Sequence, residues 1–301
     1  MPTTLTRKEA MKMFRAEPGK KFRLKDHDPA WNGDDDIPKE ERKEFAAKIL
    51  SQDTTALAEA QELLYADDSW SLLVIFQAMD AAGKDGTIKH VMSGVNPQGC
   101  QVHSFKQPST EELDHNFLWR CMKALPERGR IGIFNRSYYE EVLVVKVHPN
   151  LIAGQRIPGA DPKDPKFWEH RYDDINAFEK HLVRNGTAIV KLFLNVSKGE
   201  QRKRFLARIN EPEKHWKFAA ADVREREHWD DYMDAYEECI AATSTKWAPW
   251  YVIPADSKWV TRALVAVILA ETVKGLDLKW PEVTPEQRKA IAAAKKELEA
   301  E

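Results

Sequence analysis

The chain has 301 residues, of which 43% are hydrophobic, and this predicts a globular protein with one large α/β domain or two small ones. The formal net charge of −2 provides no overall basic field for nucleic acid, so any anion site must come from cations that cluster locally. The longest apolar run, residues 263–270, is far too short to span a bilayer. Three scattered cysteines, and first residues that lack the apolar core of a signal peptide, favour the cytoplasm. We therefore expect neither a nucleic-acid nor a membrane partner.

Residues 1–36 are charged and turn-rich, and we expect them to form an N-terminal arm along the surface. A short helix is predicted from Thr6 to Phe14. The arm contains a basic group that is either solvated, which is the favoured interpretation, or holds an anion: Lys20, Lys21, Arg23 and Lys25. A longer helix is predicted from Pro38 to Tyr65. The residues spaced for its buried face are Phe45, Ile49 and Leu57.

A buried strand, a loop of small residues and a helix follow one another in residues 71–91, SLLVIFQAMDAAGKDGTIKHV. The free N–H groups at the start of such a helix, together with its dipole, favour negative charge. Gly83 and Gly86 allow the backbone to approach a phosphate oxygen closely, and Lys84 adds a positive charge. The pattern predicts a phosphate site, although an ordinary strand-to-helix turn can have the same composition.

The loop differs from the Walker pattern G-x-x-x-x-G-K-[ST] at two positions. Ala78 replaces the first glycine, and Asp85 replaces the Ser or Thr that usually contacts magnesium. The loop also contains Asp80, and a carboxylate beside bound phosphates would be repelled unless a cation lay between them. We therefore expect a Mg²⁺ site in this loop.

Apolar runs and helical patterns alternate along the rest of the chain. Further strands are expected at Cys100–Phe105, Ile131–Phe134, Thr187–Leu194 and Trp250–Ile253, the last at a sheet edge because Pro249 precedes it. Further helices are expected at Thr87–Ser93, Glu111–Leu125 with Ser109 and Glu112 as a capping box, Phe167–Val183, Asp222–Ala242, and Trp259–Val273 capped by Ser257. Residues 146–165 are expected to form a loop. Five strands that alternate with helices predict an α/β fold in which helices cover both faces of a parallel sheet.

Asn135 and Arg136 come directly after the third strand. Because ligands bind at the carboxyl ends of parallel strands, these residues should lie beside Lys84 if the first and third strands are neighbours. The arginine would then either bind phosphate oxygens through its two-pronged guanidinium group or pair with a carboxylate of a nearby helix.

The densest basic stretch is residues 201–217, QRKRFLARINEPEKHWK, and it follows the fourth strand. Arg204 and Arg208 lie one helical turn apart and can share a face. The stretch is either a solvated helix face or a helical lid that closes over phosphates and excludes water. We expect such a lid at about residues 198–220 of a catalytic domain that spans 37–283. A helical tail, 284–301, should lie at the periphery or at a subunit contact.

Six segments, taken together and in this order, resemble the polyphosphate kinase 2 family over residues 22–280. They are QAMDAAGKDGTIKHV at 77–91, SFKQPS at 104–109, FLWR at 117–120, FNRSYYEEVLV at 134–144, EPEKHWKF at 211–218 and APWYVIPAD at 248–256. The resemblance implies a three-layer P-loop kinase core with a helical lid. It further implies Mg²⁺-dependent, reversible phosphoryl transfer between inorganic polyphosphate and nucleotides, and a homo-oligomer, commonly a dimer or tetramer.

The matching positions imply roles for individual residues. Asp80 would hold Mg²⁺ and orient the attacking phosphate, and Lys84 and Arg136 would neutralise the phosphoryl group in transfer. The residues expected to bind nucleotide phosphates are Ala82, Gly83, Asp85, Gly86, Thr87, Lys106, Asn135 and Ser137. The lid residues expected to bind polyphosphate are Arg202, Arg204, Arg208, Lys214 and Lys217.

The similarity is greatest to the class III branch, whose members phosphorylate both nucleoside monophosphates and diphosphates. Asn135 departs from the Asp-Arg-Ser form of other members, which moves any metal role to Asp80 together with Asp85 and Glu140. Two alternatives share many of these features. An ATP-dependent nucleoside monophosphate kinase has the same loop and lid, and a non-catalytic polyphosphate or nucleotide sensor needs the cations but not the carboxylates.

Overall fold

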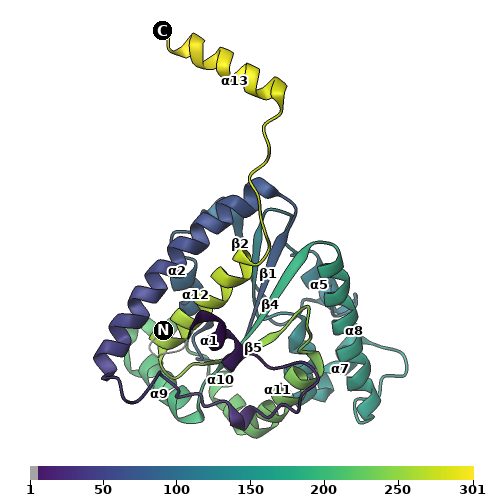
Figure 1. Cartoon of the computed structure of the whole chain (residues 1–301). Helices are drawn as coiled ribbons and strands as arrows, with labels where there is room; N and C mark the ends of the chain where they lie inside the picture. Colours follow the sequence, from purple (N-terminus) through teal and green to yellow (C-terminus); the bar gives the residue numbers. More distant parts are fainter. Residues whose placement is uncertain (1–5) are drawn as a thin grey trace.

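A computed structural model describes residues 6–301, so the first five residues of the expected arm lie outside the described part of the chain. Five parallel strands form one sheet in the order β2-β3-β1-β4-β5 (Figure 1). The strands are β1 (Ser71–Gln77), β2 (Cys100–Ser104), β3 (Ile131–Asn135), β4 (Thr187–Asn195) and β5 (Trp250–Pro254). The predicted five-stranded parallel sheet is confirmed, as is the edge position of β5. β1 pairs with β3, which meets the condition for Arg136 to lie beside Lys84.

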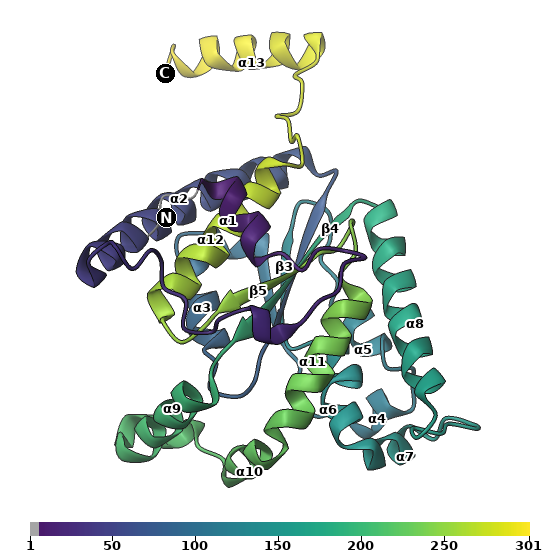
Figure 2. The same ribbon diagram turned by 60° about the horizontal axis from the view of Figure 1, so that its bottom comes forward.

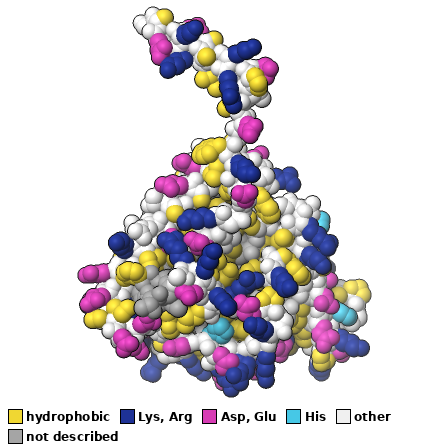
Figure 3. Space-filling model, in the orientation of Figure 1, with side chains coloured by type: hydrophobic (Ala, Val, Ile, Leu, Met, Phe, Trp, Pro, Cys, Tyr) yellow, Lys and Arg dark blue, Asp and Glu magenta, His cyan; other side chains and the backbone are white. Residues whose placement is uncertain are grey.

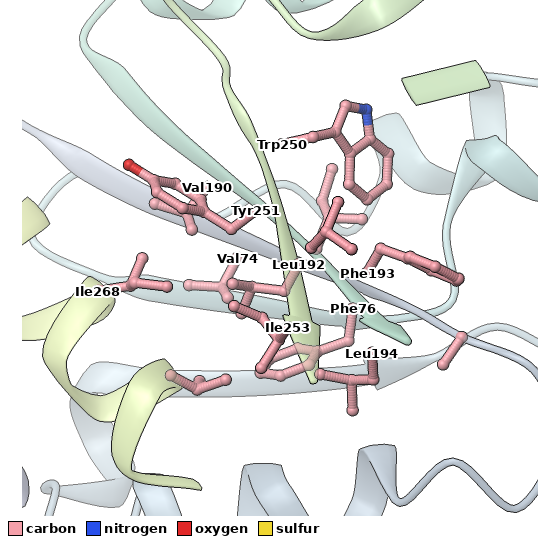
Figure 4. Packing of buried hydrophobic residues seen from close by; sticks show 14 of the residues in the cluster. Val74, Phe76, Val190, Leu192, Phe193, Leu194, Trp250, Tyr251, Ile253 and Ile268 are labelled. Atoms are coloured by element: carbon pink, nitrogen blue, oxygen red, sulfur yellow. The ribbon is translucent and has the colours of Figure 1, made fainter. Parts of the chain in front are cut away.

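Helices cover both faces of the sheet, which explains why all seven residues of β1 are buried (Figures 1 and 2). One layer contains α1 (Arg7–Phe14), α2 (Lys39–Asp67), α3 (Lys84–Val91) and α12 (Lys258–Lys274). The opposite layer is built mainly from α8 (Pro165–Arg184) and α11 (Trp229–Thr243). Figure 4 shows the apolar side chains of β1, β4 and β5 packed together with Ile268 of α12.

The remaining helices are short, except for α9 and α13. The α-helices are α4 (Thr110–Leu113), α5 (Trp119–Met122), α6 (Val144–Val147), α7 (Ile152–Gln155), α9 (Lys198–Asn210), α10 (Ala220–Arg224) and α13 (Pro285–Leu298). The 3₁₀ helices are η1 (Leu24–Asp26), η2 (Pro97–Gly99), η3 (Tyr138–Val142), η4 (Pro149–Leu151), η5 (Pro212–Lys217) and η6 (Glu225–His228). None of the helices in residues 6–301 is long and apolar enough to cross a bilayer.

Several expected elements are wrong in detail. The single helix Glu111–Leu125 is instead α4 and α5, because the side chain of Asn116 accepts from Leu118 N–H at 3.1 Å and starts a new turn there. Its capping box at Ser109 is confirmed, with Ser109 N–H donating to the Glu112 carboxylate at 2.9 Å. The helix Asp222–Ala242 is divided into α10, η6 and α11.

Three smaller expectations also fail. Residues 146–165 include the end of α6 and the whole of η4 and α7 instead of a continuous loop. Ser257 precedes α12 but makes no capping hydrogen bond with its side chain. Phe45 is 47% exposed, because the buried stripe of α2 follows Arg42, Ala46 and Ile49, and Phe45 lies beside it.

The N-terminal arm follows the edge of the sheet. Arg15 forms an antiparallel bridge with Tyr251 of β5, and Ala16 N–H donates to the Trp250 carbonyl at 2.9 Å. These contacts cover an edge strand that would otherwise expose unpaired backbone groups. At the other end of the chain, α13 has no buried residue and projects from the body (Figure 1). A subunit contact for this helix stays a prediction, as does the division into arm, catalytic domain and tail.

Candidate active site

A cavity of about 620 Å³ opens at the carboxyl ends of β1, β2 and β3, between the starts of α3 and α12 and the segment α9–η5. We call residues 78–83 the phosphate loop and this space the phosphate-loop cavity. The cavity is lined by Asp80 to Thr87, Ser104 to Gln107, Asn135, Arg136, Arg204, Ala207, Arg208, Lys214, Lys217, Lys258, Thr261 and Arg262. The three residues expected to be catalytic, Asp80, Lys84 and Arg136, therefore share one space.

The phosphate loop bends sharply from β1 into α3. Gly83 precedes the helix with φ of 106°, a conformation that glycine adopts without steric cost, and Ala81 is held at φ of 60°. The Nζ atom of Lys84 donates to the Ala78 carbonyl at 2.8 Å, which closes the loop. Burial, with a further contribution from Arg136, lowers the pKa of Lys84 to about 8. The charged form of Lys84 is therefore favoured below this pH and is lost progressively above it.

Arg136 lies beside Lys84 and is fixed from two sides. Its Nη2 atom is 2.6 Å from Asp80 Oδ1, and its Nη1 atom is 3.5 Å from Glu140 Oε2. Gln77 donates to the other oxygen of Glu140 at 3.0 Å. The carboxylates of Glu140 and Asp80 raise the pKa of Arg136 and keep it charged, although burial opposes them. These ion pairs orient the guanidinium group at the end of β3. The backbone of Arg136 has a φ of 65°.

Asn135 uses its side-chain amide within the protein. Its Nδ2 atom donates to Asp85 Oδ1 at 2.7 Å and approaches Ser104 Oγ at 3.5 Å. The contact joins the end of β3 to the first turn of α3. Asn135 therefore orients Asp85, one of the carboxylates expected to contact a metal.

The lid segment places only some of its cations toward the cavity. Arg208, Lys214 and Lys217 line it, whereas Arg202 is exposed and does not. In Figure 2, α9 and α10 lie together beyond one end of the sheet, and Figure 3 shows Lys and Arg side chains at the corresponding lower edge of the surface. The basic residues of the arm do not line the cavity either, and Arg23 pairs with Asp26 at 2.9 Å.

Arg204 lies at the cavity wall, but all of its N–H groups are used within the protein. Nη1 donates to the carbonyls of Ala82 at 2.7 Å and Ala81 at 3.2 Å. Nη2 donates to the carbonyls of Ala255 at 2.6 Å and Asp256 at 3.2 Å, and Nε donates to Glu200 at 2.9 Å. Arginine has five N–H donors, so none is left to bind polyphosphate. The expectation that Arg204 grips substrate is corrected accordingly.

Two other expected site residues are set back from the cavity. Ser137 is fully buried and its hydroxyl accepts from Tyr139 N–H at 3.1 Å, where it caps η3. Glu140 does not line the cavity and is held by Arg136 and Gln77. Within residues 6–301 no group of three His, Cys, Asp or Glu side chains could hold a metal on its own. The expected set of Asp80, Asp85 and Glu140 is therefore not a preformed metal site.

Several cavity residues were missed from the sequence. Lys258 and Arg262, one helical turn apart in α12, line the cavity, and so do Ser104, Phe105 and Gln107 after β2. The available signal was their position: each group follows the carboxyl end of a strand, where ligands bind in parallel sheets. Gln201 was also missed, and it donates from α9 to the Asp80 carbonyl at 2.9 Å.

A parallel sheet with a cationic loop at its carboxyl edge and a helical lid defines the class of protein as a phosphate-binding α/β enzyme of the P-loop kinase type. The model of the family "Polyphosphate kinase 2 (PPK2)" matches residues 39–280. This chain belongs to the polyphosphate kinase 2 family and is a kinase.

Known relatives agree with this assignment. The chain is 55% identical over 258 residues to an "ADP-polyphosphate phosphotransferase" from Rhodopseudomonas palustris, which covers 86% of this chain and 89% of that protein. It is 44% identical over 281 residues to an "AMP/ADP-polyphosphate phosphotransferase" from Meiothermus ruber, with 93% and 99% covered. The crystal structure of Polyphosphate Kinase 2 from Arthrobacter aurescens TC1 is 40% identical and superposes with a TM-score of 0.83 over 95% of this chain and 96% of that one.

Proposed function

We propose that this protein transfers a phosphoryl group reversibly between inorganic polyphosphate and nucleoside mono- and diphosphates. The observation that carries the proposal is the convergence of Lys84 and Arg136 in one cavity, where Asp80 of the phosphate loop pairs with the arginine at 2.6 Å. The names of the relatives, an ADP- and an AMP/ADP-polyphosphate phosphotransferase, support the same substrates.

The chemistry follows from the charges. An ionised terminal oxygen of the nucleotide attacks the terminal phosphorus of polyphosphate, and a new P–O bond forms. The bridging P–O bond to the next phosphate breaks, and the shortened polyphosphate leaves with the electron pair. Because the attacking oxygen is already ionised, no general base is required. The enzyme contributes in-line positioning and neutralisation of charge, which we assign to Lys84 and Arg136.

The phosphate loop supplies further contacts to the transferred group. The chain from Ala82 to Gly86 lines the cavity at the N-terminus of α3, which has no side-chain cap, and the first N–H groups of a helix have no partner within it. Lys106 lies in the cavity wall after β2, and we propose that it binds a nucleotide phosphate. From the lid, Arg208, Lys214 and Lys217 face the same space and are proposed to contact polyphosphate.

The donor set fits Mg²⁺ that is shared with substrate. Mg²⁺ is commonly held by one or two carboxylates together with substrate phosphates and water, rather than by an all-protein cage. Asp80 and Asp85 both line the cavity, and no third carboxylate completes a site among residues 6–301. We propose that Asp80 and Asp85 would hold Mg²⁺, which would supply positive charge to offset that of the substrate phosphates.

The acceptor range is proposed to include both AMP and ADP, as in the class III branch. The relatives differ on this point, since one is named for ADP alone and the other for AMP and ADP. Asn135, which the resemblance places where other members have an aspartate, is relevant because it donates to Asp85 in the cavity wall. A homo-oligomer and a cytoplasmic location also remain our proposals, the latter supported by three cysteines that are all unpaired.

One assay tests the proposal. The purified protein is incubated with long-chain polyphosphate, Mg²⁺ and each of AMP, ADP, GMP and GDP, and the products are separated. We expect ATP from ADP, and ADP followed by ATP from AMP. A parallel reaction contains ATP in place of polyphosphate, and transfer to AMP or GMP only in that reaction would identify a nucleoside monophosphate kinase. Binding of polyphosphate without turnover would identify a sensor.

A further inference from the structure

The side chain of Gln201 connects the phosphate loop to η6, the short helix between α10 and α11. Gln201 belongs to α9 and is buried, with only 1% of the residue exposed. Its Nε2 atom donates to the Asp80 carbonyl at 2.9 Å, and its Oε1 atom accepts from Nη1 of Arg226 in η6. Burial of an amide group is costly unless its polar ends are hydrogen-bonded, and here both ends have a partner.

The two partners determine which way the amide points. A guanidinium group has only donors, so Arg226 must face the amide oxygen, and the Asp80 carbonyl can only accept, so it must face the amide nitrogen. Arg226 is itself held by the Lys198 carbonyl, which is 3.3 Å from both Nη1 and Nη2. A rotated amide would place oxygen against oxygen and nitrogen against the guanidinium group. The donor toward the phosphate loop is therefore fixed.

The carbonyl that Gln201 binds lies next to the strained residue of the phosphate loop. Ala81 has a φ of 60°, a left-handed conformation that costs a non-glycine residue about 1–2 kcal/mol. Gln201 binds the carbonyl before this residue, and Arg204 binds the carbonyl of Ala81 itself at 3.2 Å. These two side chains of α9 therefore hold the peptide groups on both sides of Ala81.

The same backbone directs the side chain of Asp80. The Oδ1 atom of this carboxylate is 2.6 Å from Nη2 of Arg136. A turn of the peptide group that Gln201 holds would change the backbone angles at Asp80, and so the direction in which its carboxylate points. Gln201 does not line the phosphate-loop cavity. Any influence that it has on the reaction must therefore pass through Asp80 and not through contact with substrate.

We propose that Gln201 is a positioning residue for phosphoryl transfer, which holds Asp80 in the direction that pairs it with Arg136, and that Arg226 orients the Gln201 amide for this contact. The inference rests on the proposed function, which gives Asp80 its part in the reaction. It makes the geometry of the phosphate loop dependent on η6, at the end of the segment that covers the cavity.

The first test is Gln201→Glu, which keeps the size of the side chain and the acceptor for Arg226 but removes the donor to the Asp80 carbonyl. We expect kcat to fall about tenfold or more with AMP and with ADP, and KM for polyphosphate to stay within about twofold. The matched control, Gln98→Glu at an exposed residue of η2, makes the same change in charge and should leave both constants unchanged. A wild-type kcat, or a rise in KM for polyphosphate alone, would overturn the proposal.

Hydrogen exchange separates this inference from the proposed function, because it needs no turnover. We expect the amides of residues 78–83 to exchange about tenfold faster in Gln201→Glu than in the wild type, and those of α8 to exchange at the same rate. Faster exchange in the loop supports the positioning role even if the wild type transfers nothing, and equal exchange contradicts it. Arg226→Met frees the amide to rotate and should raise exchange in the loop by a smaller factor. No rise in this variant would contradict the orientation of the amide by Arg226.

Discussion

The inner face of α9 and the first turns of α12 approach the same phosphate loop with similar side chains, but they use them differently. On α9, Arg204 and Gln201 donate to the backbone carbonyls of residues 80–82 and have no free donor toward the cavity. On α12, Lys258 and Arg262 form no hydrogen bond or ion pair with side chains or backbone of residues 6–301. A cation in a cavity wall is thus a structural support when all of its donors are used within the protein, and a candidate substrate contact when some of them are free.

Lys191 of β4 is the extreme case of a cation whose donors are used. It is fully buried, and its Nζ atom contacts Glu179 at 2.6 Å, the Thr243 carbonyl at 2.7 Å and the Tyr139 hydroxyl at 2.9 Å. Glu179 also accepts from Tyr138 at 2.9 Å. The network joins β4 to η3, the segment that follows Arg136. Its role is therefore to support the fold behind the site.

The largest expected effect is on stability. Lys191→Met leaves Glu179 as a buried, unpaired carboxylate, and the free energy of unfolding should fall by about 3–5 kcal/mol. Urea denaturation measures the change. Lys166→Met, on the exposed surface of α8, is the control and should be close to neutral. A loss below about 1 kcal/mol would show that Lys191 is not required to satisfy this network.

The next effect is on catalysis without a loss of stability. Lys84→Met removes a cation proposed to neutralise the transferred phosphoryl group, and kcat should fall by about 100-fold or more, or roughly 3–4 kcal/mol. The melting temperature should not decrease, because the Lys84 cation is desolvated and its pKa is lowered in the fold. Steady-state assays with Lys89→Met, an exposed lysine of the same helix, provide the control. Near wild-type kcat in folded Lys84→Met would refute the assignment.

Arg204→Lys separates support from substrate binding. Lysine keeps the charge but cannot reach four carbonyls and Glu200 at once, so the loop loses charge-assisted bonds worth roughly 1.5–3 kcal/mol each. We expect kcat to fall about tenfold or more with AMP and with ADP as the acceptor, and KM for polyphosphate to change little. Arg202→Lys, at an exposed residue of α9 that does not line the cavity, is the matched control and should leave kcat and KM unchanged. A selective rise in KM for polyphosphate would mean that Arg204 contacts this substrate directly.

The smallest effect is a pH dependence. The pKa of Lys84 is lowered to about 8 by burial, so the free enzyme carries this charge below that pH and loses it as the pH rises further. The value of kcat/KM for polyphosphate should therefore decline above about pH 8, and the alkaline decline should move to higher pH in Lys84→Arg. A pH profile of kcat/KM for both proteins measures this. Identical alkaline limbs would exclude Lys84 as the titrating group.

The sequence predicts most of the sheet because buried parallel strands leave a plain signal. The run LLVIF of β1 and the nearly apolar run of β4 are typical of strands covered on both faces. The convergence of Lys84 and Arg136 was predictable for a related reason, since both follow the ends of neighbouring strands.

The use of individual side chains could not be predicted in the same way. The partners of Arg204 include Ala255 and Asp256, which lie 51 and 52 residues along the chain, and no local pattern records such contacts. When these contacts are not known, the pattern of a basic helix face is equally consistent with polyphosphate binding. Phe45 illustrates the same limit on a helix, where a position beside the buried stripe is not distinguished by spacing alone.

One measurement tests most directly whether cations with free N–H donors bind substrate and cations with occupied donors do not. It is the affinity for polyphosphate, determined by calorimetry at one salt concentration. Arg204→Lys should bind polyphosphate with a Kd within about twofold of that of the wild type. The double variant, Lys258→Gln with Arg262→Gln, should bind polyphosphate about tenfold more weakly or worse. The reverse order, with affinity lost in Arg204→Lys and kept in the double variant, would contradict the account.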